Sequence, residues 1–412
     1  MSGGIGSVAT QALADRAAQR LLSTYPTPSA AFVRGKGTAL FDVDDRAFLD
    51  FLCGLGVTNL GHAHPAVAAA VADQVATLVH TSNLFVTEPA VALAERLAKI
   101  VGWEDAKVFF AQCGATANEA AIKLARRHGK RQHPDKVRVV ALEGSFHGRT
   151  LATLEATGQP AKHAPFAPLA EFVDHVAHDD AAALRAAVTD RTCAVLLEVV
   201  QGEGGVRPVP DDLLLAARAA CDAVGALLIV DEVQTGIGRT GPWFAFQDTP
   251  VVPDVVTVAK ALANGLPIGA CIAHGDAAGA FEVGDHGTTF GGNPVTCAAA
   301  NAVLDTIEAD GVLAAGRTRG RRLAQGLESL VGNAPFAAGV RGRGLLLGLE
   351  LDAPVAADVE TACRERGLIV NAVAPDVLRL APPLTVSRQE IDQALAAVAA
   401  SLDAVAGTET PS

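Results

Sequence analysis

The chain has 412 residues, of which 50% are hydrophobic and 19% are charged, so it has ample apolar material for a core and does not resemble a disordered protein. Its net charge of −12 argues against nucleic acid or an anionic membrane as a partner. The cysteines form no Cys-x-x-Cys motif, and Met1–Tyr25 contains no signal-peptide core. No stretch approaches membrane-spanning length. For these reasons we expect a cytoplasmic protein.

The N-terminal segment predicts a surface helix followed by a small sheet. We expect the helix within residues 1–24, where Tyr25-Pro26-Thr27-Pro28 stops it. The alternating runs that follow predict short strands at Ala31–Val33, Ala39–Asp42 and Phe48–Leu52.

A His-x-His pair follows, formed by His62 and His64. A zinc site would need further ligands, and none are close in the sequence. Pro65 at the first position of a helix over Ala66–Val79 is the plainer explanation of this segment. We therefore expect no metal.

From residue 63 onward, predicted helices alternate with short apolar runs, the pattern of an α/β fold with a mostly parallel sheet covered by helices on both faces. The predicted strands are Lys107–Ala111, Arg138–Leu142, Ala194–Val199, Leu227–Asp231, Val255–Ala259 and Gly269–His274. This segment, residues 63–303, is expected to form a large domain.

Beyond about residue 295 we expect a long helix, then a strand region over Val340–Leu351, and a final helix that begins at Ser387 with Glu390 in a capping box. Strands near both ends of the chain indicate a small domain built from residues 1–62 and 304–412.

Two of the predicted strands deliver reactive side chains at their carboxyl ends, where open α/β sheets bind ligands. The first strand ends in Asp231, and the second is followed by Lys260. A lysine in apolar surroundings readily loses its charge and forms a Schiff base, and an aspartate keeps a heterocyclic nitrogen protonated. Pyridoxal phosphate needs both groups. Taken singly, a helix-capping aspartate and a solvated lysine are equally good explanations, but the pair favours the site.

The helix expected from Gly114 to His128, ended by Gly129, begins directly after a strand. Its small N-terminal residues Gly114 and Ala115 leave backbone amides free to bind an anion. A capping box formed by Thr116 and Glu119 is a second, compatible interpretation.

Other polar or aromatic side chains also follow strand ends. Phe146 could stack on a planar cofactor and Arg149 could bind a carboxylate, although core packing and a surface position explain them equally well. Glu203 lies in a glycine-rich segment that indicates close backbone approach. Arg379 interrupts an apolar stretch, so we expect it to have a carboxylate partner.

One motif is misleading. Residues 236–241 match the G-x-G-x-x-G fingerprint of dinucleotide-binding proteins. The glycines do not follow their strand directly, Pro242 and three aromatics make a poor helix after them, and no acidic residue ends a second strand at the expected distance. We therefore reject a nicotinamide cofactor.

In order along residues 25 to 400, the chain carries the motifs NLGHAHP (59–65), GATANEAAIKLAR (114–126), FHGRT (146–150), QGEGGV (201–206), LLIVDEVQTGIGRTG (227–241), AKALANGLPIGA (259–270), HGTTFGGNP (286–294) and LRLAPPL (378–384). With these motifs the sequence resembles the class III aminotransferases, which have fold type I and use pyridoxal 5'-phosphate, and it is closest to the acetylornithine and ornithine group. The resemblance implies a large domain with a mostly parallel sheet and a small α+β domain from both termini.

The resemblance also implies roles for the cofactor-binding residues. Lys260 would bind the cofactor and carry the proton, Asp231 would pair with the ring nitrogen, and Gln234 would bond the ring hydroxyl. Val233 and Phe146 would sandwich the ring, and Gly114 and Ala115 would hold the phosphate. Thr289 would reach the phosphate in the other subunit, which makes the protein an obligate homodimer.

For the substrates, the resemblance implies that Arg149 binds the α-carboxylate of an ornithine-like molecule and Arg379 that of glutamate or 2-oxoglutarate, with Glu203 masking Arg379 in turn. The implied reaction, in arginine biosynthesis, moves the ω-amino group of N-acetylornithine to 2-oxoglutarate and gives N-acetylglutamate 5-semialdehyde and glutamate. Ornithine, succinylornithine, 4-aminobutyrate and carrier-linked lysine remain alternative amines. Decarboxylation, an amino shift within one substrate and a non-catalytic binding role are the competing functions.

The chain departs from its relatives at a few positions. Cys113 stands where they usually have serine, Thr116 lies in the same motif, Val199 replaces a proline, and Phe290 replaces a common tyrosine. A thiol is a weaker phosphate donor than a hydroxyl, so the affinity for the cofactor is expected to change, but no catalytic group is lost.

Overall fold

A seven-stranded sheet forms the centre of the larger lobe in the structure, a computed structural model that describes residues 7–408. Its strands, in spatial order, are β4 (Lys107–Ala111), β12 (Gly269–Ala273), β11 (Val255–Val258), β10 (Leu227–Asp231), β7 (Thr192–Leu197), β5 (Arg138–Leu142) and β6 (Val173–Val176). Only β12 runs antiparallel to its neighbours, so the predicted mostly parallel sheet is confirmed. The edge strand β6 was not predicted, because Asp174 and His175 interrupt its apolar pattern.

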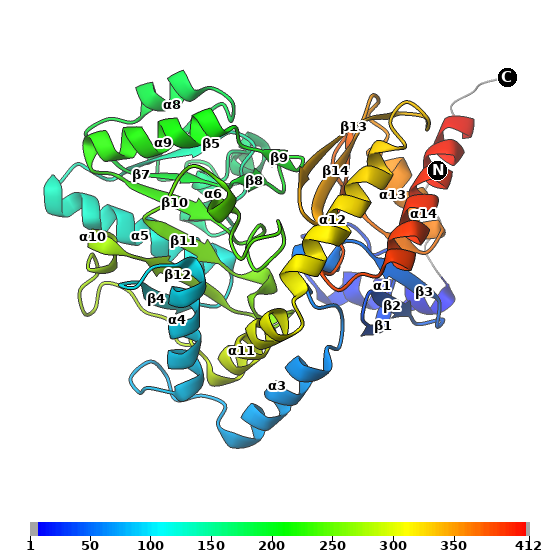
Figure 1. The fold of residues 1–412 in the computed structure, drawn as a ribbon, viewed down its shortest axis with the longest axis horizontal. Helices are drawn as coiled ribbons and strands as arrows, with labels where there is room; N and C mark the ends of the chain where they lie inside the picture. Colours follow the sequence, from blue (N-terminus) through cyan, green and yellow to red (C-terminus); the bar gives the residue numbers. More distant parts are fainter. Residues whose placement is uncertain (1–6, 409–412) are drawn as a thin grey trace.

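Both faces of this sheet are buried, as the continuous apolar runs predict. In β10, Leu227 and Ile229 pack with the helix α5 (Gly114–Gln132) on one face. Leu228 and Val230 point to the other face, where they share a core with the helix α9 (Asp211–Val224). Figure 1 shows the sheet between these two helices.

The prediction that Gly129 ends the helix α5 is wrong, because α5 continues to Gln132. A Cβ atom at position 129 would lie 2.3 Å from the carbonyl oxygen of Lys136 and 2.8 Å from Cβ of Cys193. The glycine is therefore required by close packing against neighbouring segments and not by helix termination.

The long helix expected beyond residue 295 is two helices, α11 (Pro294–Ala309) and α12 (Val312–Glu328). Gly311 separates them with a φ of +59°, a left-handed conformation that favours glycine and ends the first helix. The remaining helices of the larger lobe are α3 (Pro65–Thr77), α4 (Glu88–Val101), α6 (Leu151–Ala156), α7 (Pro160–His163), α8 (Ala181–Ala187) and α10 (Gly275–Ala278).

The smaller lobe contains two four-stranded sheets (Figure 1). The first has the order β1 (Phe32–Lys36), β2 (Ala39–Asp42), β3 (Ala47–Asp50) and β15 (Leu368–Ile369); the second has the order β13 (Ala337–Arg343), β14 (Leu346–Leu351), β17 (Val377–Leu380) and β16 (Asn371–Ala374). The parallel pairing of β3 with β15 joins segments from the two ends of the chain. The division of the chain at residues 62 and 303 stays a prediction.

The helices α13 (Ala356–Glu365) and α14 (Arg388–Thr408) contact each other beside the second sheet. The predicted capping box at the start of α14 is confirmed: the Ser387 amide donates to Glu390 Oε2 at 2.6 Å, and the Glu390 amide donates to Ser387 Oγ at 3.2 Å. Two short strands, β8 (Val200–Gln201) and β9 (Arg207–Pro208), pair near the boundary between the lobes.

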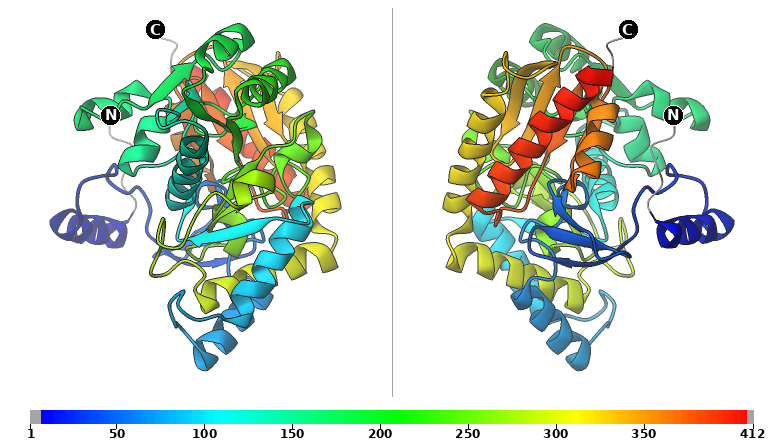
Figure 2. Two further views of the ribbon diagram at one scale, coloured as in Figure 1. Left: turned by 90° about the vertical axis from the view of Figure 1, so that its left-hand side faces the viewer. Right: turned by 90° about the vertical axis from the view of Figure 1, so that its right-hand side faces the viewer.

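The predicted N-terminal helix is α1 (Val8–Arg20), which projects from the side of the molecule in Figure 2. The first six residues of the predicted range lie outside the described part of the chain. Within residues 7–408, none of the helices combines the length and the apolar character needed to span a bilayer.

Candidate active site

The two predicted reactive residues lie at the same edge of the central sheet. Strands β10 and β11 are parallel neighbours, with Asp231 opposite Thr257, and Lys260 follows shortly after the end of β11. Lys260 begins the 3-10 helix η3 (Lys260–Ala263) with a φ of +42°. A left-handed backbone is strained for a residue with a side chain, and such strain clusters at functional sites.

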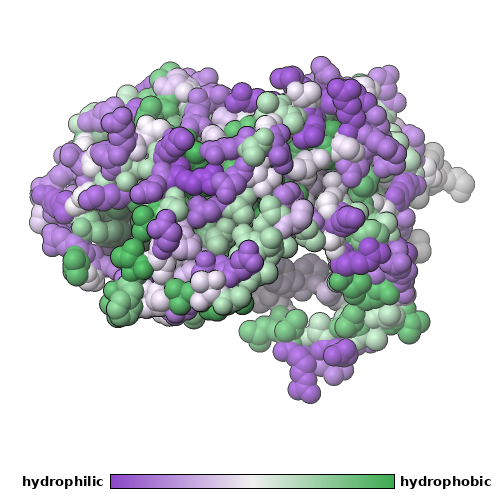
Figure 3. All heavy atoms as spheres, turned by 60° about the horizontal axis from the view of Figure 1, so that its bottom comes forward, coloured by the Kyte–Doolittle hydropathy of each residue, from purple (hydrophilic) through white to green (hydrophobic). Residues whose placement is uncertain are grey.

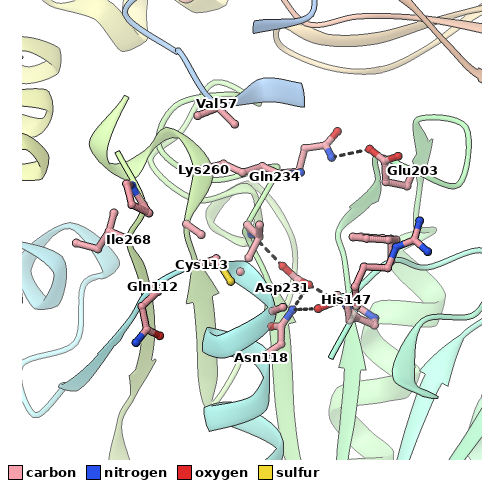
Figure 4. Close-up of a pocket in the computed structure, with 18 of the residues that line it drawn as sticks. Val57, Gln112, Cys113, Asn118, His147, Glu203, Asp231, Gln234, Lys260 and Ile268 are labelled. Atoms are coloured by element: carbon pink, nitrogen blue, oxygen red, sulfur yellow. Dashed lines mark hydrogen bonds and ion pairs between the residues drawn. The ribbon is translucent and has the colours of Figure 1, made fainter. Parts of the chain in front are cut away.

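A cavity of about 410 Å³ lies at this edge. It is lined by almost all of the residues that the sequence predicted for the site, namely Gly114, Ala115, Phe146, Arg149, Glu203, Asp231, Val233, Gln234 and Lys260. Figure 4 labels four of them, Glu203, Asp231, Gln234 and Lys260, and shows Val57 above them.

Asp231 is buried and held by three hydrogen-bond donors. Its Oδ2 atom accepts from Asn118 Nδ2 at 2.7 Å and contacts Nδ1 of His147 at 2.8 Å, while its Oδ1 atom accepts from the Val233 amide at 2.9 Å. Asn118 is fixed in turn, because its Oδ1 atom accepts from the Thr257 hydroxyl at 2.6 Å. These contacts leave the carboxylate in one orientation (Figure 4).

Lys260 also lines the cavity and is half-buried, and its amine makes no hydrogen bond or ion pair with another residue between 7 and 408. Burial lowers the pKa of this amine, although the negative charge of Glu203 opposes the shift. A desolvated lysine with a lowered pKa is a nucleophilic lysine.

Arg379 lies on β17 and is almost fully buried, with 1% of its side chain exposed. It forms the predicted ion pair: its Nη1 atom donates to Glu203 Oε1 at 2.5 Å and to Gln234 Oε1 at 3.0 Å. Burial opposes ionisation of Glu203, but the charge and hydrogen bond of Arg379 outweigh it and lower the pKa of this carboxyl. Arg379 itself does not line the cavity, but its partners Glu203 and Gln234 do, and both are labelled in Figure 4.

The N-terminus of α5 faces the cavity with free amides. Neither Gly114 nor Ala115 donates its backbone amide to another described residue. The capping box predicted for Thr116 and Glu119 is wrong: Thr116 caps the helix together with Cys113, and Glu119 instead accepts from the hydroxyl of Thr150. The free amides and the dipole of a 19-residue helix suit an anion.

Thr289 is the predicted cofactor residue that lies outside the cavity of its own chain. It is exposed and lines a second cavity of about 480 Å³, which shares Gln112 with the first. Its predicted contact with the phosphate in a second subunit stays a prediction.

A model of the Aminotransferase class-III family matches residues 23–402. An acetylornithine aminotransferase of Streptomyces coelicolor is 50% identical over 402 residues, which cover 97% of this chain and 98% of that protein. This chain belongs to the class-III aminotransferases.

Solved structures of the family have the same fold. The N-acetylornithine aminotransferase of Stenotrophomonas maltophilia has a TM-score of 0.82 and 34% identity, covering 93% of this chain and 98% of that one. An ornithine aminotransferase of Toxoplasma gondii, whose structure shows partial occupancy of PLP at its active site, has a TM-score of 0.91 and 29% identity, covering 98% of this chain and 97% of that one. The protein is therefore an aminotransferase with fold type I.

Sequence reasoning missed three residues around the reactive pair of this aminotransferase. His147 and Asn118 both contact Asp231, and Glu198 lines the cavity with its carboxylate bonded to the amides of Phe146 and Gly202. Burial raises the pKa of Glu198 to about 7. The position of Glu198 directly after the apolar strand β7 could have identified it as a site residue. No feature of the neighbouring sequence identifies Asn118.

Proposed function

We propose that this aminotransferase uses pyridoxal 5'-phosphate to move the ω-amino group of N-acetylornithine to 2-oxoglutarate, giving N-acetylglutamate 5-semialdehyde and glutamate. The observation that carries the proposal is the ion pair of Arg379 with Glu203, whose charges both act on the half-buried amine of Lys260. The acetylornithine aminotransferases that are 48–50% identical to the chain support this choice of substrate and its place in arginine biosynthesis.

The residues present fit this cofactor. Lys260 offers a half-buried amine that no residue between 7 and 408 binds, Asp231 offers an oriented carboxylate, and the amides of Gly114 and Ala115 suit a phosphate. A Cβ atom at position 114 would lie 2.7 Å from Cγ1 of Val233, so only glycine fits beside this side chain without displacing it. When bound, the cofactor supplies an electron sink for the carbon that carries the reacting amino group.

The chain's own residues then divide the work. Lys260 would hold the cofactor and would move the proton at the substrate carbon. Asp231 would stabilise positive charge on the ring nitrogen, and at about 4 Å with an effective dielectric near 20 such a pair is worth roughly 4 kcal/mol. Val233 and Phe146 are proposed to flank the ring, with Gln234 at its hydroxyl.

Two substrates of different shape must use the same cavity in turn. Arg149, which lines the cavity, is proposed to bind the α-carboxylate of N-acetylornithine. While Glu203 neutralises Arg379, the second cation is masked; when Glu203 moves away, Arg379 becomes free to bind a carboxylate of 2-oxoglutarate. This exchange explains how one pocket serves both halves of the reaction.

We also propose that two copies assemble. Leu84, Phe85 and Val86 are 87%, 68% and 85% exposed, and Phe290 is 61% exposed next to Thr289. Figure 3 shows the face on which α3 lies, where green apolar groups are interspersed with purple hydrophilic ones. A second copy that covers the exposed residues Leu84, Phe85, Val86 and Phe290 would bring Thr289 to the active-site cavity of that second copy.

The free cysteines support the cytoplasm as the compartment.

Steady-state kinetics of the cofactor-loaded protein test the reaction. With 2-oxoglutarate as acceptor, N-acetylornithine should give the highest kcat/KM among N-acetylornithine, ornithine, succinylornithine and 4-aminobutyrate. Lys260→Ala should lower kcat on the order of 10⁴-fold, whereas the exposed Lys130→Gln should leave it unchanged. A higher kcat/KM for another amine would overturn the substrate, and a Lys260→Ala protein that still transaminates would overturn the mechanism.

A further inference from the structure

Two cations approach the ring of Phe146 at the border of the active-site cavity. Cζ of Arg149 lies 5.6 Å from the ring centroid, and Nζ of Lys162 lies 6.0 Å from it. Across residues 7–408, neither of the two side chains forms an ion pair. They differ in this respect from Arg379, whose charge is neutralised by Glu203.

Lys162 is held in place by its neighbours. It lies on the short helix α7, is half-buried, and donates from Nζ to Oε1 of Gln159. The side-chain amide of Gln159 is itself fixed, because its Nε2 atom donates to the carbonyl oxygens of Gly144 and Ser145 at 3.3 and 3.2 Å. The ammonium group is thus tied to the loop that leads directly into Phe146.

The surroundings of Lys162 disfavour its charge. Burial lowers the pKa of its ammonium group, the nearby charge of Arg149 lowers it further, and Glu203 opposes both effects. Arg149 is exposed and Lys162 is half-buried, and two neighbouring like charges, one of them partly removed from water, are an unfavourable arrangement when neither has an anionic partner among residues 7–408. A carboxylate bound near both would relieve the repulsion and accept hydrogen bonds from both.

We propose that Lys162 is a specificity residue that helps Arg149 bind the substrate carboxylate distant from the reacting amine. The proposal rests on the proposed function, in which Arg149 takes the α-carboxylate of N-acetylornithine. It adds a second cation at this position, so the site selects amines that carry such a carboxylate over amines that lack it. A core role does not explain Lys162, because its charged group lies 6.0 Å from the ring centroid of the cavity residue Phe146 and forms no ion pair with a carboxylate among residues 7–408.

The test compares N-acetylornithine with N-acetylputrescine, which is the same molecule without the carboxylate. Lys162→Gln should lower kcat/KM for N-acetylornithine about tenfold through KM, as expected for one lost charge-assisted hydrogen bond, and leave N-acetylputrescine unchanged. Lys162→Arg should keep most of the preference. Lys130→Gln removes an equal charge from the exposed side of α5 and should change neither substrate.

The possible outcomes separate the two proposals. If the wild-type protein does not use N-acetylornithine, the proposed function fails. If it does, but Lys162→Gln keeps the full preference or loses both amines equally, only the role of Lys162 is overturned, since a structural defect would not distinguish the two amines. Where N-acetylputrescine is bound but not turned over, its inhibition constant against N-acetylornithine gives the same comparison.

Discussion

The two ends of the active-site cavity are built in opposite ways. At the end formed by β10 and α5, Asp231 accepts three hydrogen bonds, and its partner Asn118 is itself fixed by Thr257. At the proposed substrate end, Arg149 and Lys162 lack anionic partners among residues 7–408, and the ion pair of Arg379 is with a side chain in a glycine-rich segment.

This difference matches the proposed demands on each end. A cofactor that stays bound through every cycle needs a fixed carboxylate, and a buried carboxylate that accepts several hydrogen bonds is held in one orientation. Two substrates that alternate need charges that can be masked and released, which a closed network would prevent. The cofactor end is therefore preorganised, whereas the substrate end has cationic side chains that are available to bind a carboxylate.

Apart from the loss of Lys260, the largest effect should come from changing Asp231 at the cofactor end. Asp231→Asn keeps the shape of the side chain but removes the negative charge opposite the ring nitrogen, so kcat should fall on the order of 10³-fold. The measurement is kcat at saturating cofactor, with the thermal unfolding temperature as the control for folding. A fall of less than about tenfold would contradict the role of Asp231.

An effect on stability should come from Glu232, which follows Asp231 and is fully buried. Its Oε1 atom accepts from the Phe246 amide at 2.8 Å, and burial raises its pKa from 4.5 to about 7, with Asp231 adding to the shift. The folded chain binds this proton more tightly than the unfolded chain does. The free energy of unfolding should therefore fall as pH rises through that window and level off above it.

Glu232→Gln should remove this part of the pH dependence, on the order of 3 kcal/mol between about pH 5 and about pH 8. Urea unfolding of both proteins across the range measures it. Parallel pH profiles for the two proteins would show that Glu232 does not hold its proton in the folded state.

The smallest of these effects should come from the substrate end. Glu203→Gln leaves Arg379 without its anionic partner, so Arg379 stays available for 2-oxoglutarate. We expect the KM for N-acetylornithine to rise about tenfold while the KM for 2-oxoglutarate stays the same or falls. Equal changes in both constants would argue against alternate masking by Glu203.

The sequence predicted the two reactive residues of the site, Asp231 and Lys260, but not the residues that hold Asp231 in place. Apolar runs ending at Asp231 and before Lys260 placed both groups at one sheet edge, because buried parallel strands have a recognisable pattern. Asn118 and His147 could not be predicted as partners of Asp231, since their contacts depend on how a helix and a loop far apart in sequence pack together.

Arg239 is a second residue whose structural role could not be predicted from the sequence. The glycine pattern around it was rejected as a dinucleotide fingerprint, but its structural use was not foreseen. Its fully buried guanidinium donates to the carbonyl oxygens of Leu345 at 3.0 Å and Pro382 at 2.5 Å, and also to Asn59. It therefore connects the loop after β10 to three segments associated with the smaller lobe, a role that only the tertiary structure reveals.

The most direct test of the account follows the visible absorbance band of the cofactor-loaded protein. N-acetylornithine alone should bleach the band, and 2-oxoglutarate added afterwards should restore it, because both substrates use one preorganised cofactor end in turn. Bleaching by another amine but not by N-acetylornithine would refute the proposed substrate. The absence of a band after pyridoxal 5'-phosphate is added, or a band that 2-oxoglutarate does not restore, would contradict the account itself.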